Sequence, residues 1–278
     1  MKILATEKFI SQEVPVKLLE IGEIDEFDQW LPDDTTPLFV QIERSSPDIL
    51  FVGLRHQLTK ELLAKAPNLK IIATRTTGLD HIDLEYCQEN KIQVLSLRGE
   101  QDFLSKVPAT AELTFIMMGQ LLRQTRHELK GKILGIIGYG RIGKLLDSYA
   151  KAFGMDVIRA DKDEQGIYGL ESLLASSDIV SLNITADEDN RNFMDLTKFQ
   201  QMRHGTWFIN SSRGWLVDNQ ALEWALGNRL VGAWSDFKVD FDHPNLLITD
   251  HQGGKTIESL SATEAFMADK LINYVKNN

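Results

Sequence analysis

The chain has 278 residues, of which 43% are hydrophobic and 25% are charged, and its formal net charge is -10. Such a length exceeds the usual size of one domain, and the composition is that of an ordinary globular protein, so we expect two domains. The acidic balance argues against a nucleic-acid partner, because no basic stripe is present to displace counterions from phosphates. No apolar run reaches the length of a membrane span, so we expect no membrane partner either.

The sequence holds one cysteine, Cys87. A single cysteine excludes an internal disulfide and any metal site built from several cysteines, and we expect no bound metal. Residues 1–10 lack the long apolar core of a secretion signal and are more typical of a first strand. From these features we expect a cytoplasmic protein.

Short apolar runs alternate with helical stretches along the chain, which is typical of parallel sheets with helices on both faces. In the first part they predict four strands, at residues 2–5, 48–52, 70–73 and 93–96. A second series predicts six strands, at residues 133–137, 156–160, 178–182, 206–209, 231–234 and 246–249. Six strands separated by helices are what one complete dinucleotide-binding sheet requires. The acidic run at residues 23–28 is interpreted as solvated surface.

Two helices connect these series. Residues 109–123 are apolar enough for a buried helix that joins the two halves. Residues 257–275 carry Phe266, Leu271, Ile272 and Val275 at helical spacing, and we expect this helix to return to the first domain. The predicted fold is therefore α/β, with two Rossmann-like or flavodoxin-like doubly wound domains. We expect a substrate-binding domain at residues 1–100 plus 257–278 and a cofactor domain at residues 101–256.

A predicted strand, a tight turn and a helix start follow one another at residues 133–143, where Gly138, Gly140 and Gly143 fill the pattern G-x-G-x-x-G. The first glycine permits the turn, the second lets the backbone approach a pyrophosphate, and the third packs the helix on the strand. Helix N–H groups and the positive end of the helix dipole then face the phosphates. The pattern alone is weak evidence, but its strand–turn–helix context favours a dinucleotide site over a plain glycine-rich turn.

The strand predicted at residues 156–160 is followed by Asp161. A carboxylate at this place accepts hydrogen bonds from ribose hydroxyls and repels a 2'-phosphate. We therefore expect NAD rather than NADP as the cofactor, with Arg159 and Lys162 as the residues that oppose this preference. The remaining candidate cofactor-binding residues lie in the turn and after later strands: Tyr139, Arg141, Ile142, Asn183, Ser212 and Asp236.

Four segments, in this order, resemble the D-isomer-specific 2-hydroxyacid dehydrogenases, the group with D-3-phosphoglycerate dehydrogenase and glyoxylate/hydroxypyruvate reductase. Residues 77–83 (TGLDHID) resemble the family's G-x-D-x-x-D loop, and residues 128–132 (ELKGK) with the glycine turn resemble its cofactor entry. Residues 209–214 (INSSRG) resemble its N-x-x-R-G signature, and residues 249–256 (TDHQGGKT) its T-P-H-x-x-G-x-T segment. The resemblance implies two similar α/β domains with the active site in the cleft between them.

Reduction of a 2-keto acid needs a hydride donor, a cation for the substrate and an acid for the developing alkoxide. Arg213 follows a predicted strand, where residues face the ligand crevice of an open α/β sheet, and its planar fork suits a carboxylate. His251 is the candidate proton donor, since imidazole exchanges a proton near neutrality. His251 is one of six histidines, so its position in the family motif decides. The resemblance further implies that backbone amides around Thr77 and Gly78 bind the substrate carboxylate and that Asp236 lies near the nicotinamide carboxamide.

The chain departs from the family pattern in the loop that follows Asp236. The family carries a glutamate there, usually before a proline, whereas residues 236–244 read DFKVDFDHP. Asp240 is our candidate for the acid that tunes His251, and Asp242 is the second. Asp250, which stands where the family usually has proline, is a third source of the charge. A carboxylate beside the imidazole would raise its pKa and hold its tautomer.

A second departure concerns assembly. The family usually has about twenty residues between the interdomain helix and the glycine-turn strand, which form much of its dimerisation arm. Here only residues 124–127 lie between the predicted interdomain helix and the ELKGK segment. A connection this short cannot extend across a partner subunit, because each residue spans at most about 3.3–3.6 Å. We expect a monomer or an atypical homodimer.

Together these features predict an NAD-dependent D-2-hydroxyacid dehydrogenase that interconverts a small 2-keto acid and the D-2-hydroxy acid. Two alternatives stay open. One is another NAD enzyme of the family, such as a formate dehydrogenase, whose site also lacks the glutamate. The other is a non-catalytic NAD(H)-sensing protein, as in the C-terminal-binding-protein corepressors.

Overall fold

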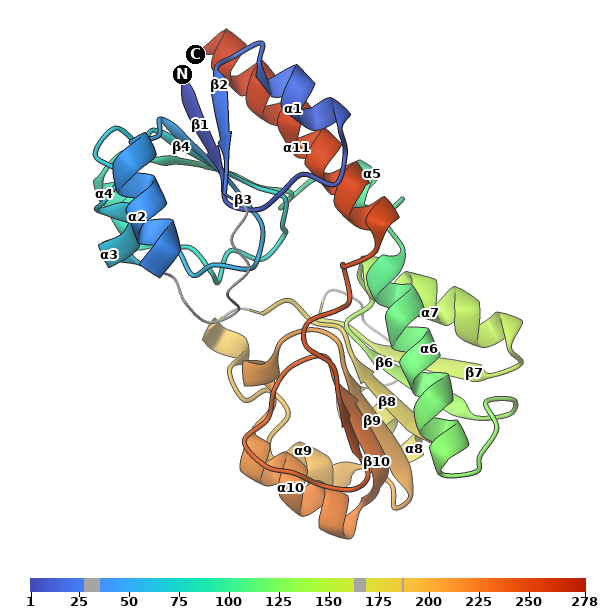
Figure 1. Cartoon of the computed structure of the whole chain (residues 1–278). Coiled ribbons are helices and arrows are strands. Elements are labelled where there is room, and N and C mark those ends of the chain that lie inside the picture. The colour runs from blue at the N-terminus through green and yellow to red at the C-terminus, as the bar shows by residue number, and fades with distance from the viewer. Residues whose placement is uncertain (28–35, 163–168, 187) are drawn as a thin grey trace. The chain divides into compact units, whose positions relative to one another are not determined.

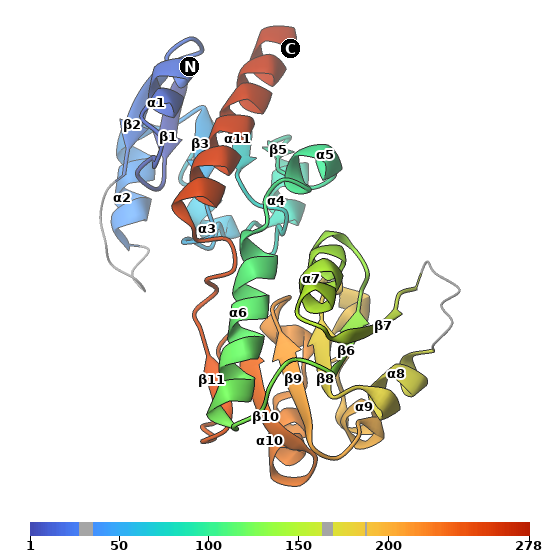
Figure 2. The ribbon, with the colours of Figure 1, turned by 90° about the vertical axis from the view of Figure 1, so that its right-hand side faces the viewer.

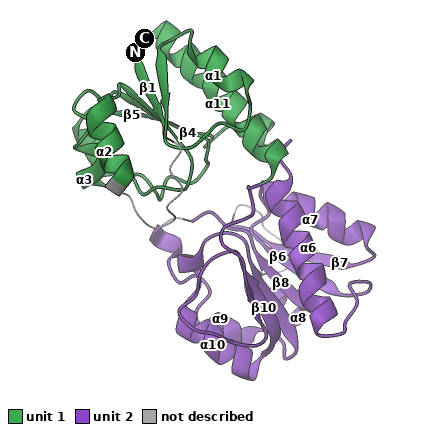
Figure 3. Ribbon diagram, viewed as in Figure 1, with its two compact units in different colours: residues 1–104, 256–278 green, residues 105–255 purple. Residues whose placement is uncertain are grey.

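The computed structural model describes residues 1–27, 36–162, 169–186 and 188–278. The chain forms two compact units: unit 1 contains residues 1–104 and 256–278, and unit 2 contains residues 105–255 (Figure 3). Within the described ranges, none of the helices has the length and apolarity needed to cross a membrane. The same residues contain no group of three His, Cys, Asp or Glu side chains that could hold a metal ion.

Unit 1 contains a parallel sheet of five strands in the order β2-β1-β3-β4-β5. The strands are β1 (Lys2–Ala5), β2 (Glu23–Glu26), β3 (Ile49–Val52), β4 (Ile71–Thr74) and β5 (Gln93–Leu95). This is the flavodoxin-like order, in which the chain winds outward from a central strand in both directions. The sequence-based prediction of a doubly wound domain is confirmed for this unit.

Helices cover both faces of this sheet because alternate residues of each strand point to opposite sides. The helices are α1 (Glu13–Leu18), α2 (Thr36–Ser45), α3 (Lys60–Leu63), α4 (Leu84–Glu89), α5 (Gln101–Leu104) and α11 (Ile257–Asn277). Ile3 and Ile49 pack on the face that carries α1 and α11, whereas Leu4 and Leu50 pack with α2, α3 and α4. Figure 1 shows the two groups of helices on opposite sides of β1, β3 and β4.

Strand β2 was not predicted. Its side chains are mostly exposed, as expected for the acidic run at residues 23–28, but its backbone pairs with β1 from Lys2↔Glu23 to Ala5↔Glu26. Because β2 lies at the sheet edge and only Ile24 is partly buried, it carries no apolar run from which a strand can be recognised. Phe27, directly after it, is buried, and Asp28 lies outside the described residues.

Unit 2 contains a parallel sheet of six strands in the order β7-β6-β8-β9-β10-β11, seen side by side in Figure 2. The strands are β6 (Ile133–Ile137), β7 (Asp156–Ala160), β8 (Ile179–Leu182), β9 (Thr206–Asn210), β10 (Leu230–Ser235) and β11 (Leu246–Ile248). All six had been predicted, and each end lies within one residue of its predicted position. The order reverses at β6, since the chain moves to β7 on one side and then to β8 on the other.

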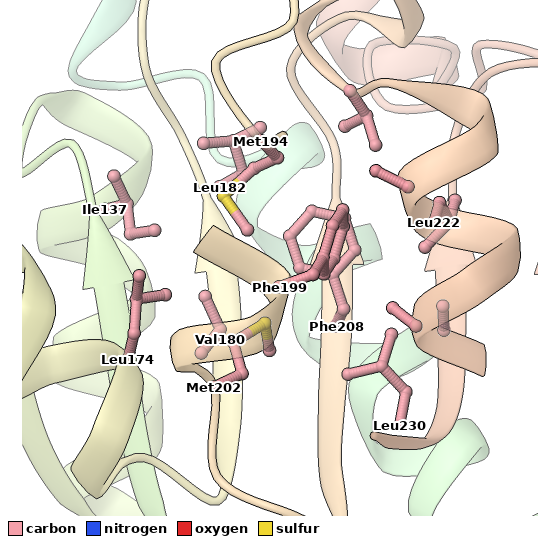
Figure 4. Close-up of a cluster of buried hydrophobic side chains, with 14 of the residues drawn as sticks. Ile137, Leu174, Val180, Leu182, Met194, Phe199, Met202, Phe208, Leu222 and Leu230 are labelled. Carbon is pink, nitrogen blue, oxygen red and sulfur yellow. The ribbon is translucent and has the colours of Figure 1, made fainter. Parts of the chain in front are cut away.

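One face of this sheet packs against α6 (Ala109–Gln124) and α7 (Arg141–Ala152) through a cluster that includes Met118, Leu146 and Trp234. The other face packs against α8 (Leu170–Ser176), α9 (Leu196–Gln201) and α10 (Asn219–Asn228). Figure 4 shows Phe199 and Phe208 at the centre of this second cluster. The described residues of this unit also form two short 3-10 helices, η1 (Glu188–Asn190) and η2 (Gly214–Leu216).

The turn between β6 and α7 has the conformation that its glycines predict. Gly138 has φ 90°, and a Cβ there would lie 2.6 Å from the carbonyl oxygen of Asn183. At Gly143 a Cβ would lie 2.4 Å from the carbonyl oxygen of Gly138, so the helix could not approach the strand. A Cβ at Gly140 would meet no atom within 4 Å, so the fold itself does not require glycine at that position.

We therefore predict different effects of two alanine substitutions on stability. Gly143→Ala should lower the free energy of unfolding by about 1–3 kcal/mol, the usual cost of overpacking. Gly140→Ala should change it by less than about 1 kcal/mol, because φ at Gly140 is -75° and open to any residue. Urea denaturation followed by circular dichroism measures both. Equal loss of stability in the two variants would contradict this account of the turn.

Candidate active site

The glycine turn lies at the point where the strand order of unit 2 reverses. Gly138 follows β6, and Asn183 follows the neighbouring strand β8; the N–H of Asn183 donates to the carbonyl oxygen of Ile137 at 2.7 Å. In open α/β sheets ligands bind outside the carboxyl ends of the strands at such a point. Helix α7 begins here with N–H groups that have no partner within the helix, which suits a phosphate. The open space at Gly140 lets a pyrophosphate approach the backbone, so these residues fit the dinucleotide.

Asp161 and Tyr139 lie together beside this turn. The backbone N–H of Tyr139 donates to a carboxylate oxygen of Asp161 at 2.5 Å. The Tyr139 ring lies under the guanidinium of Arg159 at 4.2 Å, and its hydroxyl donates to the buried Asp147. This hydrogen bond raises the pKa of Tyr139 above its ordinary value. Asp161, which is predicted to favour NAD over NADP, and Arg159, which is predicted to oppose that preference, therefore both contact Tyr139.

Two other residues of the turn, Arg141 and Ile142, contact the rest of unit 2. The guanidinium of Arg141 donates to the carbonyl oxygen of Val107 at 2.7 Å, and burial lowers its pKa. Ile142 packs against the core shared by α6 and α7. Arg141 thus ties the first residue of α7 to the segment that leads into α6.

The signature after β9 is organised by Asn210, which is 1% exposed. Its side-chain amide donates to the carbonyl oxygen of Arg213 at 2.9 Å, and its oxygen accepts the N–H of Ser212 at 3.0 Å. The Ser212 hydroxyl donates to the carbonyl oxygen of Leu182 at 3.0 Å, which ties the turn to the end of β8. The asparagine therefore fixes the backbone from which the half-buried Arg213 side chain projects.

Asp236, at the end of β10, holds the segment that contains His251. Its carboxylate is buried and accepts three hydrogen bonds, from the Thr249 hydroxyl at 2.6 Å and the N–H groups of Gln252 and Gly253 at 2.8 Å each. Its carbonyl oxygen accepts the N–H of His251 at 2.8 Å. His251 itself has φ 47°, in the left-handed region that non-glycine residues rarely occupy. These contacts of Asp236 are thus those of a loop anchor.

Phe237 is the residue that brings the two main candidates together. Its ring centroid lies 4.8 Å from that of the His251 ring and 5.9 Å from Cζ of Arg213. Gly214 makes room for it, since a Cβ at Gly214 would lie 3.1 Å from the Phe237 Cβ. Arg213 follows β9 and His251 follows β11, so residues from two separate strand ends share one aromatic neighbour. Phe237 was not among the predicted site residues, and nothing in the single sequence distinguishes it from a core aromatic residue.

The three acids proposed to tune His251 lie at different places in unit 2. Asp240 is exposed and accepts a hydrogen bond from the side-chain amide of Asn219, the first residue of α10, at 2.8 Å. Asp240 lines a hollow of about 470 Å³ together with Gly214, Trp215 and Lys238. Asp242 and Asp250 are exposed as well, and Asp242 lines a hollow of about 340 Å³ beside His243.

Thr77 and Gly78 belong to unit 1, in the loop that follows β4. The Thr76 hydroxyl donates to the carbonyl oxygen of Gly78 at 2.8 Å and lies 2.8 Å from the Thr74 hydroxyl. Thr77 is exposed, whereas Thr74 and Thr76 are buried. The Thr74 and Thr76 hydroxyls therefore hold the buried side of the loop, and Thr77 lies on its exposed side.

Comparisons with known proteins agree with these features. Residues 109–253 match the family described as D-isomer specific 2-hydroxyacid dehydrogenase, NAD binding domain. The chain is 30% identical over 281 aligned positions to D-3-phosphoglycerate dehydrogenase of Haemophilus influenzae, covering 85% of this chain and 67% of that protein. It is 29% identical to glyoxylate reductase of Thermococcus litoralis, covering 96% of this chain and 93% of that protein.

A solved structure shows the same fold. The cofactor (NAD+)-bound 3-phosphoglycerate dehydrogenase of Entamoeba histolytica superposes with a TM-score of 0.86 at 22% identity, covering 100% of this chain and 96% of that chain. The family match spans the glycine turn, the Asn210 turn and the Asp236 anchor in one stretch. The chain belongs to the D-isomer-specific 2-hydroxyacid dehydrogenases, and it is an oxidoreductase with that family's NAD-binding domain.

Proposed function

We propose that this chain interconverts a small 2-keto acid and the corresponding D-2-hydroxy acid, with His251 as proton donor and acceptor and Arg213 as the substrate cation. The observation that carries the proposal is the packing of Arg213 and His251 against one ring, that of Phe237. A carboxylate-binding fork and an imidazole held near each other are what reduction of a 2-keto acid requires. NAD(H), when bound, supplies or accepts the hydride at the substrate carbon.

The role of each residue follows from its chemistry. His251 gives its proton to the carbonyl oxygen during reduction and takes it back during oxidation, so the charge on the oxygen never develops fully. Arg213 binds the carboxylate and polarises the neighbouring carbonyl. Thr77 and Gly78 bind the carboxylate through backbone N–H groups. Asp236 holds the His251 loop and, we further propose, faces the carboxamide of the cofactor.

Asp240 remains the first candidate for the acid that sets the proton affinity of His251, followed by Asp242 and Asp250. All three are exposed, so replacement by asparagine should leave the fold intact. The acid that acts on His251 is the one whose asparagine variant shifts the pH profile of kcat to lower pH, because loss of the charge lowers the imidazole pKa. An unchanged profile in all three variants would remove these acids from the mechanism.

A second candidate function is NAD(H) binding without turnover. The hydrogen bond from Asn219 to Asp240 favours it, because the candidate acid is engaged with the start of α10. A formate-dehydrogenase-like activity is a third candidate. Incubation with NADH and a panel of 2-keto acids, and with NAD and formate, distinguishes the three through the absorbance of the reduced nicotinamide.

The first test of the proposal concerns cofactor choice. Asp161 should make NADH bind more tightly than NADPH, because its carboxylate accepts from the ribose and repels a phosphate. Titration by tryptophan fluorescence measures both affinities. Asp161→Ser should narrow or reverse the difference, whereas Lys162→Ala serves as the neighbouring control and should widen it. Tighter NADPH binding by the unaltered protein would show that Arg159 and Lys162 decide the preference.

The second test concerns catalysis. His251→Ala should lower kcat for the best keto acid by roughly a hundredfold or more, the scale of a lost general acid, with NADH affinity nearly unchanged. Arg213→Lys should raise KM and lower kcat, because a point charge replaces a bidentate fork. The exposed His204, between α9 and β9, provides a matched control as His204→Ala. Kinetics like those of the unaltered protein in either site variant would exclude that residue from the proposed mechanism.

The third test concerns assembly. We propose a monomer, or a homodimer that does not use the family's arm, because α6 ends at Gln124 and β6 begins at Ile133. The connection is held within its own unit: the Trp207 indole N–H donates to the Thr125 hydroxyl at 3.2 Å, and His127 contacts the Trp207 ring. Light scattering after size exclusion gives the mass. A crystal structure with residues 125–132 wrapped over a twofold partner would overturn the proposal.

A further inference from the structure

Unit 1 contains a cluster of three charged side chains, two of them largely buried, that the proposed chemistry does not use. The guanidinium of Arg75 lies between two carboxylates: one arm pairs with Glu7 and the other with Glu264 at 3.1 Å. The side chains of Arg75 and Glu264 are 10% and 2% exposed. Buried charges of this kind persist only when they are paired and hydrogen-bonded.

Each carboxylate of the cluster also holds a loop. Glu264, on α11, accepts the N–H groups of Ile10 at 2.9 Å and Ser11 at 3.2 Å, in the loop after β1. Glu7 accepts the N–H of Arg55, in the loop after β3, at 3.4 Å. The cluster therefore ties together the segments that follow three neighbouring strands of the sheet and the C-terminal helix.

The backbone beside the cluster is shaped for it. A Cβ at Gly53, directly after β3, would lie 2.4 Å from a carboxylate oxygen of Glu7. The N–H of Arg75 donates to the carbonyl oxygen of Val52 at 3.2 Å, which holds Arg75 against the end of β3. The Arg75 side chain is thus fixed from both its backbone and its guanidinium.

Arg75 directly precedes the loop of Thr76, Thr77 and Gly78. An arginine at this place would suggest direct binding of the substrate carboxylate. Its two guanidinium arms are instead engaged by Glu7 and Glu264, and it is almost fully buried. Because β4 ends at Thr74, Arg75 is the residue that links this strand to the loop.

We propose that Glu7, Arg75 and Glu264 form a positioning network that holds the backbone at residues 76–78 in the shape that binds the substrate carboxylate. The inference rests on the proposed function, since it concerns the loop assigned to the carboxylate there. Burial raises the pKa of Glu264 despite the nearby guanidinium, which means that burial disfavours the charged carboxylate. The glutamine variant replaces this carboxylate with a neutral group of nearly the same shape. Arg75 stays paired with Glu7 in that variant.

The test compares Glu264→Gln with the unaltered protein. The amides of residues 76–80 should exchange hydrogen about tenfold faster, since one of the charged hydrogen bonds that fix Arg75 is weakened. KM for the best keto acid should rise about tenfold, with kcat within about twofold and NADH affinity unchanged. Asp269→Asn is the matched control, because Asp269 also lies on α11 but pairs with Lys17 at the surface. The control should leave exchange and KM unchanged.

Cys87 reports whether unit 1 stays folded in each variant. Its thiol is buried with α2, α3 and α4, on the sheet face away from α11, and burial raises its pKa to about 11. It should therefore react with a thiol reagent at pH 8 only when the unit opens. Equal labelling rates in the variants and the unaltered protein show that faster exchange is local to the loop.

The outcomes separate the network from the proposed function. Unchanged exchange at residues 76–80 in Glu264→Gln overturns the network, and so does a loss of thermal stability with KM unaltered. If no keto acid is turned over by the unaltered protein, the proposed function fails, while exchange and Cys87 labelling still decide the positioning role. If Glu264→Gln does not fold, Glu7→Gln carries the same measurements, because Glu7 is 21% exposed and tolerates replacement better.

Discussion

The parallel direction of every strand in both sheets is the constraint on which the arrangement of functional residues depends. Parallel strands have their carboxyl ends at the same edge, so whatever follows each strand is gathered there. In unit 2 this edge carries Gly138, Asn183, Arg213 and Asp236, which follow four different strands. In unit 1 it carries Glu7, Gly53 and Arg75, which follow β1, β3 and β4. Neither group depends on closeness in the sequence.

Each edge is stabilised by a buried carboxylate that accepts backbone N–H groups. Asp236 accepts those of Gln252 and Gly253, and Glu264 accepts those of Ile10 and Ser11. Loops at a sheet edge have few backbone partners of their own, and a carboxylate offers two oxygens that can satisfy several N–H groups at once. Removing such an acid leaves these donors without their partner, and the cost is highest for a buried donor such as the N–H of Gly253. Both acids are thus tied to loop shape before any role in chemistry.

The elements that the sequence predicted well are those defined by local patterns. The residue pattern predicted both ends of β6 and β7 correctly, and the glycine spacing predicted the turn at Gly138. Both features are defined by residues that are neighbours in the chain. Strand β2 was not predicted because it is the outermost strand of its sheet and pairs with β1 through backbone groups only, while its acidic side chains face water. The contact of Arg75 with Glu264 spans 189 positions and leaves no periodic trace in the sequence. The placement of Asp240 beside Asn219 likewise depends on how the loop after β10 folds against the start of α10, which spacing along the chain does not determine.

The backbone at His251 gives a physical reason to assign that residue a role. A left-handed conformation costs a non-glycine residue of order 1–3 kcal/mol, and glycine would adopt it without that cost. The conformation is enforced from both sides, since Asp236 accepts the N–H of His251 through its carbonyl oxygen and the next two N–H groups through its carboxylate. The contact with Phe237 fixes the imidazole ring once the backbone is set. Ser46, Lys91, Arg126 and Asn192 share the left-handed conformation, and what sets His251 apart is that the Asp236 anchor fixes its backbone.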